Sequence, residues 1–126
     1  MSIKKIIKGL ALSMLLSSGA ANADWGDVYY CQTTNFIGIE LDGEMKNYIL
    51  EKFTFKLDQT KNAMVLGSTG YLRDGVFELV KSASFPSQES WDAKGDYSMT
   101  YFKEGKFLYT SNTLSIHSIS ADCDKF

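Results

Sequence analysis

The sequence predicts a small all-β domain, an antiparallel meander of eight or nine short strands closed into a barrel. Three features support this expectation: short runs that alternate apolar and polar residues, glycine-containing turns between them, and one cysteine near each end of the domain. Alternation with a period of two is typical of strands, and Asp-Gly pairs favour tight hairpins. A two-sheet sandwich is the alternative architecture.

The first 23 residues have the pattern of a cleaved Sec-type signal peptide. Lys4, Lys5 and Lys8 precede an apolar run at 9–16, and 21–23 read Ala-Asn-Ala, which fits a signal-peptidase site. The run is far shorter than the ~20 residues that span a bilayer, so we expect cleavage and no stable membrane anchor afterwards. We therefore predict a signal peptide at 1–23 and a single β-domain at 24–126, located in the bacterial periplasm or secreted.

The domain left after cleavage is acidic. Removing three lysines with the signal leaves 10 basic residues against 15 acidic ones, a net charge of -5. Nucleic acid and anionic membranes favour clustered Lys and Arg, so we expect neither as a partner.

Cys31 and Cys123 are the only two cysteines. In an oxidising compartment such a pair predicts a structural disulfide, and the Cys-x-x-Cys spacing of a redox site is missing. A disulfide requires Cα atoms within about 7 Å, so the first and last strands must lie side by side in a barrel or face to face in a sandwich.

The strands are predicted at 27–33, 35–41, 52–57, 63–67, 70–73, 76–82, 96–103, 106–110 and 113–121. Asp42-Gly43, Asp74-Gly75 and Glu104-Gly105 are predicted as two-residue turns, because glycine supplies the positive φ that such turns need. Residues 58–62 are expected to form a further reversal. Residues 44–51 fit either an extended strand or a short helix, and 82–90, which contains Pro86, is predicted to be the longest loop.

Catalytic and metal-binding patterns are not found in the sequence. His117 is the only histidine, and strand alternation from Ile116 predicts that it points to solvent. Asp92 and Asp96 flank Gly95 and are interpreted as solvated turn residues rather than a general acid–base pair or a calcium site. We therefore expect no enzyme activity, no metal and no cofactor.

Aromatic residues indicate a binding surface instead. If Glu104-Gly105 forms a two-residue turn, Phe102 pairs with Phe107 and shares a face with Tyr109, while Tyr97, Met99, Tyr101 and Leu108 share the other face. Only one face of a half-buried hairpin enters the core, so Phe102, Phe107 and Tyr109 are predicted as a candidate binding patch. The alternative is that the hairpin is covered on both sides, or that a bulge at Gly105 turns all the aromatics inward. Trp91 is predicted to close an end of the barrel.

The chain also resembles a known family in layout. Tyr29-Tyr30-Cys31, Trp91 followed by Lys94-Gly95-Asp96, and a cysteine near the C-terminus are similar to the pattern of small periplasmic inhibitors of c-type lysozyme. The resemblance implies an eight-stranded β-barrel and an inhibitory function, although the Ser-Gly-x-x-Tyr loop of those inhibitors has no counterpart here. An acidic domain would suit a basic enzyme.

Two functions are therefore expected. The first is a non-enzymatic exported binding module for an unknown protein or a small apolar ligand. The alternative is a proteinaceous inhibitor of a cell-wall hydrolase such as c-type lysozyme.

Overall fold

The computed structural model describes residues 23–80 and 90–126. The predicted signal peptide, except Ala23, and the predicted loop with Pro86, except Ser90, lie outside these residues. Within the described ranges, no helix is long and apolar enough to cross a membrane.

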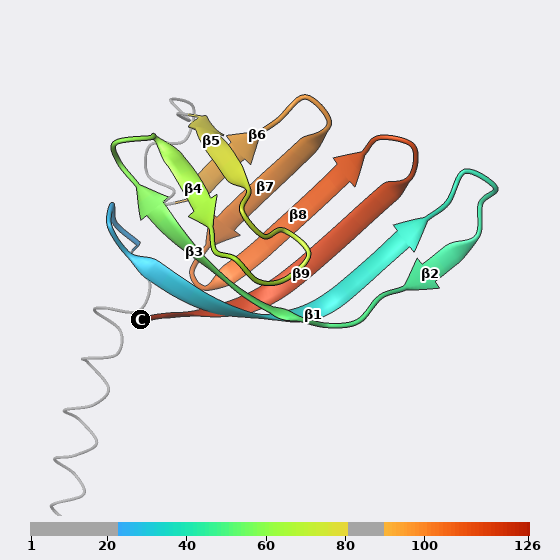
Figure 1. Cartoon of the computed structure of the whole chain (residues 1–126), viewed down its shortest axis with the longest axis horizontal. Coiled ribbons are helices and arrows are strands. Elements are labelled where there is room, and N and C mark those ends of the chain that lie inside the picture. The colour runs from blue at the N-terminus through green and yellow to red at the C-terminus, as the bar shows by residue number, and fades with distance from the viewer. Residues whose placement is uncertain (1–22, 81–89) are drawn as a thin grey trace, which may run out of the picture.

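The described residues form a single antiparallel sheet that closes on itself (Figure 1). Its nine strands are β1 (Val28–Ile39), β2 (Met45–Asn47), β3 (Lys52–Asp58), β4 (Ala63–Leu66), β5 (Val76–Val80), β6 (Trp91–Lys94), β7 (Ser98–Lys103), β8 (Lys106–Asn112) and β9 (Ile116–Lys125). From β3 to β9 each strand pairs with the next in sequence, and β9 returns to pair with β1. The predicted barrel is confirmed: β1 and β3 to β9 close it, and β2 is an extra strand beside the end of β1.

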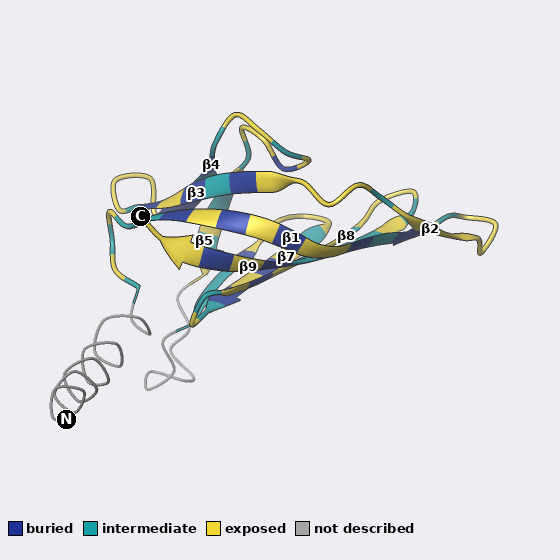
Figure 2. Ribbon diagram, turned by 90° about the horizontal axis from the view of Figure 1, so that it is seen from below, coloured by how far each residue is buried: buried dark blue, intermediate teal, exposed yellow. Residues whose placement is uncertain are grey.

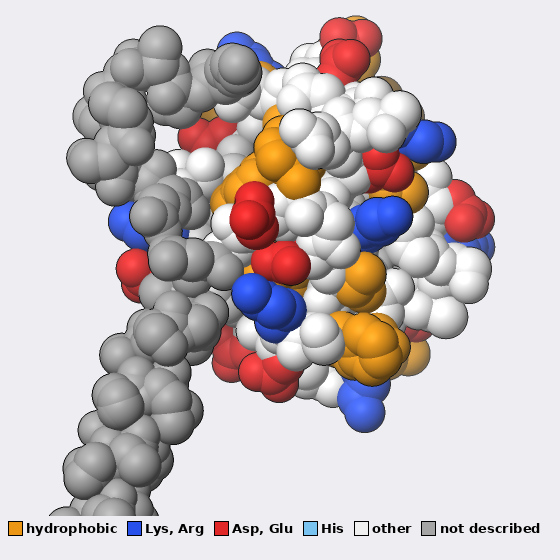
Figure 3. Space-filling model, turned by 90° about the vertical axis from the view of Figure 1, so that its left-hand side faces the viewer, with side chains coloured by type: hydrophobic (Ala, Val, Ile, Leu, Met, Phe, Trp, Pro, Cys, Tyr) orange, Lys and Arg blue, Asp and Glu red, His pale blue; other side chains and the backbone are white. Residues whose placement is uncertain are grey.

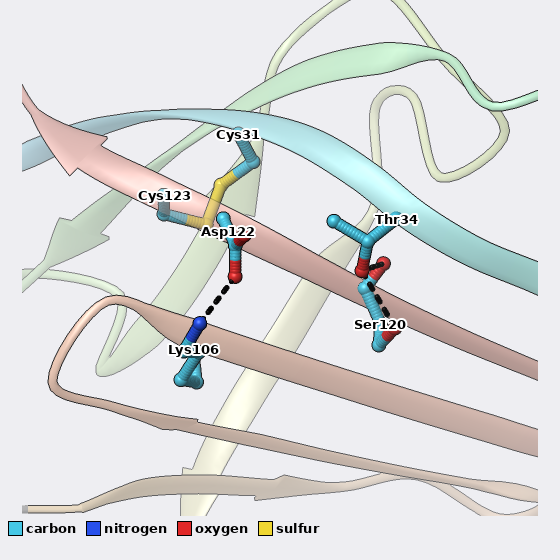
Figure 4. The surroundings of a disulfide bond; sticks show 6 residues. All are labelled: Cys31, Thr34, Lys106, Ser120, Asp122 and Cys123. Atoms are coloured by element: carbon cyan, nitrogen blue, oxygen red, sulfur yellow. Dashed lines mark hydrogen bonds and ion pairs between the residues drawn. A yellow bond between two sulfur atoms is a disulfide. The ribbon is translucent and has the colours of Figure 1, made fainter.

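The seam between β1 and β9 closes the barrel. Its pairing runs from Tyr29 opposite Lys125 to Ile39 opposite Ile116. Cys31 lies opposite Cys123 with Cα atoms 4.0 Å apart, and their sulfurs are bonded at 2.10 Å (Figure 4). The predicted disulfide between the first and last strands is confirmed.

Two further side-chain contacts lie close to the disulfide (Figure 4). The Thr34 hydroxyl lies 2.8 Å from Ser120 Oγ, and Lys106 Nζ lies 2.7 Å from Asp122 Oδ1. Both partners of the Lys106–Asp122 ion pair are well exposed, so its contribution is on the order of 0 to 1 kcal/mol.

The first strand corrects two predicted elements. Segments 27–33 and 35–41 were predicted as separate strands, but they form the one strand β1 with an irregularity between Thr33 and Asn35. A bulge inserts one residue without ending the pairing, so both halves remain beside β9. Segment 44–51 is not a helix, since only Met45–Asn47 is regular and it pairs with β1 as a strand.

The connection from β4 to β5 contradicts the strand predicted at 70–73. Residues 71–74 form turns closed by backbone hydrogen bonds from Arg73 N–H to Gly70 O and from Gly75 N–H to Leu72 O. Gly70 has a φ of +86°, which takes the chain out of the extended conformation. Asp74-Gly75 therefore belongs to a longer loop rather than a two-residue hairpin, and Leu72 is buried within it.

The structure confirms some of the other predicted turns and strands and corrects the rest. Glu104 and Gly105, with φ of 50° and 80°, form the predicted two-residue turn, and residues 59–62 form the predicted reversal. The turn at Asp42-Gly43 is longer than two residues, because Ile39 pairs with Met45. The strand predicted at 96–103 begins only at Ser98, and β6 was not predicted because Trp91–Lys94 lacks apolar alternation.

The barrel interior is filled by side chains from several strands. Buried and exposed residues alternate along β1 and β3, as Figure 2 shows, and the largest fully buried side chains are Phe55, Leu57, Met64, Phe102 and Phe107. Phe55 contacts Phe102 edge to face with ring centres 5.0 Å apart. Trp91 is half-buried, packing edge to face on Trp25 at 5.0 Å and against the core.

Tyr29 makes the stability of the fold depend on pH in the alkaline range. Burial and then the charge of Asp27 raise the pKa of Tyr29 to about 12 from its ordinary value of 10.0. Because the folded state holds this proton more tightly, its contribution is complete below pH 10 and is lost as pH rises to about 12. We expect Tyr29 to contribute a fall of about 2 to 3 kcal/mol in the free energy of unfolding over this window, measured by urea denaturation. Tyr29→Phe should reduce the fall by this amount, whereas Tyr30→Phe, at an exposed neighbour, should not.

Candidate functional site

The predicted patch of Phe102, Phe107 and Tyr109 lies inside the barrel. Phe102 and Phe107 are 1% and 0% exposed, and Tyr109 is half-buried against Phe77. The predicted register is confirmed, with Phe102 opposite Phe107 and Tyr101 opposite Leu108. The choice of face was wrong: the set containing Tyr97, Met99, Tyr101 and Leu108 is the exposed one.

The exposed hairpin residues belong to a larger surface that we call the outer sheet face. Cross-strand partners share a side of a sheet, so the pairings from β2 through β1, β9 and β8 to β7 define this surface. Its outward residues are Asn35, Ile37, Ile39, Met45, Asn47, Tyr97, Met99, Tyr101, Leu108, Thr110, Asn112, Ile116, Ser118 and Ser120.

None of the residues in that set is charged. Charged residues continue the same side of the sheet around it: Asp92 and Lys94 on β6, Lys103 on β7, and the Lys106–Asp122 pair. A depression of about 380 Å³ adjoins the face, where Tyr97, Met99 and Ile116 meet the Lys94–Asp96 segment. By contrast, the end of the barrel that faces left in Figure 1 mixes acidic, basic and apolar side chains (Figure 3). The outer sheet face therefore has the character of a contact surface.

A second group of side chains lies on the inner side of the same strands. Phe36 packs with Tyr48 and with Tyr71 at ring-centre distances of 4.5 and 4.8 Å. His117 lies 5.6 Å from Tyr48 and 6.0 Å from Tyr71. We call these four residues the tyrosine–histidine cluster. The prediction that His117 points to solvent was wrong, because Ile116 occupies the outer side of β9.

Gly38 makes room for this cluster. A Cβ at position 38 would lie 3.0 Å from Tyr48 Cε2 and 3.1 Å from His117 Cδ2. A glycine inside a strand commonly marks such a close approach. The missing side chain lets Tyr48 and His117 cover β1, and Tyr71 brings the β4–β5 loop onto the same cluster.

The polar contacts of the cluster hold the Tyr48 hydroxyl between Glu40 and His117. The Tyr48 hydroxyl lies 3.2 Å from Glu40 Oε2, to which it donates, and 3.5 Å from His117 Nε2. Partial burial, the hydrogen bond to Glu40 and the charges of Glu40 and Tyr71 raise the pKa of Tyr48. Burial and Tyr71 likewise raise the pKa of Tyr109, although hydrogen bonds to Ser111 and Ser98 oppose the shift. Both phenols therefore stay protonated at neutral pH.

The two aspartates considered from the sequence differ in environment. Asp96 is exposed beyond β6, whereas Asp92 lies within β6, and its Oδ1 is buried without a hydrogen-bond partner in the described part of the chain. The interpretation of both as turn residues therefore fails for Asp92. Across residues 23–80 and 90–126, no three His, Cys, Asp or Glu side chains form a group that could hold a metal ion.

No protein-family model, curated protein or solved structure matches this chain.

The close fit at Gly38 can be tested by a double-mutant cycle. Gly38→Ala should lower the free energy of unfolding by about 1 to 3 kcal/mol, because the added methyl group displaces Tyr48 and His117. His117→Ala should create space for that methyl group, so the double variant should lose less stability than the sum of the two single changes. Urea denaturation of the four proteins measures this coupling, and strict additivity would contradict the assignment.

Proposed function

We propose that this chain is an exported, non-enzymatic protein-interaction module that binds its partner through the outer sheet face. The observation that carries the proposal is the uncharged, exposed surface shared by five strands. Met45, Tyr97 and Met99 are each at least 60% exposed on it. A surface of this kind on a stable domain is typical of a protein contact.

The filled interior argues against a small apolar ligand held inside the barrel. An enclosed space lined by Phe36, Phe53, Leu72 and Ile119 among others has a volume of about 10 Å³. This is roughly the space that one water molecule occupies, and it is far below the ~300 Å³ at which ligand pockets begin. The aromatic core around Phe102 and Phe107 leaves no room there, so a partner has to bind outside.

The export part of the proposal is supported by the sequence and by the disulfide. The signal-like residues 1–23 and the Cys31–Cys123 disulfide suit an oxidising compartment, the bacterial periplasm or the medium. The net negative charge and the uncharged face do not favour nucleic acid as a partner.

Site-specific photo-crosslinking in exporting cells tests the proposed face. A photoreactive residue in place of Met99 should give a discrete adduct, because Met99 lies in the contact. The matched control is Val76, which is 55% exposed on β5 against 60% for Met99. A discrete adduct from Met99 alone supports the proposal, and no adduct, or equal adducts from both positions, counts against it.

Inhibition of a cell-wall hydrolase is the second candidate. It is supported by the closed eight-stranded barrel, which the resemblance to c-type lysozyme inhibitors implies, and by the acidic charge. The purified protein should slow lysis of cell walls by c-type lysozyme more than an unrelated protein of equal negative charge does. Equal lysis rates with an excess of this chain would exclude this function.

A further inference from the structure

The part of the sheet that carries the outer sheet face extends beyond the barrel as a single layer. The ends of β1, β8 and β9 project past the barrel together with β2, as Figures 1 and 2 show. The tyrosine–histidine cluster covers the inner side of this extension. On the outer side, Ile39, Met45 and Ile116 are 42%, 63% and 44% exposed. Sheets bury an apolar face against a second layer, and the described residues supply none here.

The charge distribution indicates what can supply that layer. The exported domain carries a net charge of -5, so contact between two copies through most surfaces would bring like charges together. The outer sheet face is the exception, because its own residues are uncharged and the charged residues that adjoin it, Asp92, Lys94, Lys103 and the Lys106–Asp122 pair, carry both signs. Two copies can approach through it with less of this repulsion, and each copy provides the antiparallel layer that the other lacks.

We infer that the partner at the outer sheet face is a second copy of this chain, bound face to face about a two-fold axis. The inference rests on the proposed function and names its partner. Ile39 and Ile116 lie near the centre of the contact, and β2 and β7, the latter with Met99, lie at its edges. A two-fold contact uses the same residues on both copies, so it closes at the dimer and does not form a filament.

The size of the face sets the expected affinity. A standard stable interface uses about 20 to 30 residues from each partner, and the outer sheet face is smaller than that. We therefore expect a reversible monomer–dimer equilibrium rather than a permanent dimer. Dilution should release the monomer with its barrel and disulfide intact.

Sedimentation equilibrium of the exported protein over a wide range of concentrations tests the inference. The average mass should rise from one chain towards two. Ile39→Lys should weaken association at least tenfold, because each copy would bury an unpaired ammonium group. If Ile39→Lys fails to fold, Ser118→Arg, which removes no apolar side chain, should weaken association to a similar extent. Val76→Lys, at an exposed apolar residue of β5, should associate like the wild type.

The possible outcomes separate this inference from the proposed function. A wild-type protein that stays monomeric at every concentration overturns the dimer, yet an adduct between Met99 and a different protein would still support the interaction face. A dimer that persists equally in Ile39→Lys and Ser118→Arg overturns the inference as well, since the contact then lies elsewhere. Equal weakening by Val76→Lys would show a general charge effect and would also overturn it.

Discussion

The pairing of β1 with β9 is the constraint on which the rest of the structure depends. It joins the two ends of the described domain along ten paired positions, and the disulfide fixes one of them covalently. Without this seam, the sheet would have two free edges, at β1 and at β9, each offering unpaired backbone groups to other chains. Closing the sheet removes these edges and lets side chains from strands distant in sequence meet in one aromatic core.

The same seam creates the surface with which we associate function. β1 and β9 remain paired beyond the core, as far as Ile39 and Ile116. This length exceeds what the barrel needs, and it produces the single-layered extension with two distinct sides. The inner side is held by Tyr48 and His117 above Gly38, whereas the outer side keeps apolar residues exposed in an acidic protein. The packed tyrosine–histidine cluster and the proposed contact surface thus lie on opposite sides of the same two strands.

Much of the fold could be predicted because local signals determine it. Glu104-Gly105 set the turn, and with it the whole register of β7 and β8. Alternation divides a strand into two sets of residues but does not say which set faces inward, and here both sets contain aromatics. Phe102, Phe107 and Tyr109 were therefore assigned to the wrong side. The direction of the His117 side chain was predicted wrongly for a related reason. Ile116 is apolar but exposed, so its apolar character did not indicate the inner side of β9.

Other features depend on contacts between distant residues and have no local signal. The strand β6 is short and lacks alternation, and only its pairing with β7 makes it a strand. The tyrosine–histidine cluster joins residues from β1, β9, the segment after β2 and the β4–β5 loop. The glycine within an apolar run at 36–39 is the one sequence signal that could have indicated it.

The central claim is that the pairing of β1 with β9, linked by the disulfide, holds the barrel closed. Hydrogen exchange of the β1 and β9 amides, compared between the oxidised and the reduced protein, tests it most directly. A loop of 92 residues corresponds to about 4 to 5 kcal/mol in the chain-entropy model. We predict that reduction lowers the protection of both strands together by about this amount. The Cys31→Ala, Cys123→Ala double variant should show the same lowered protection as the reduced protein. Protection of β1 and β9 that is unchanged on reduction would contradict the account.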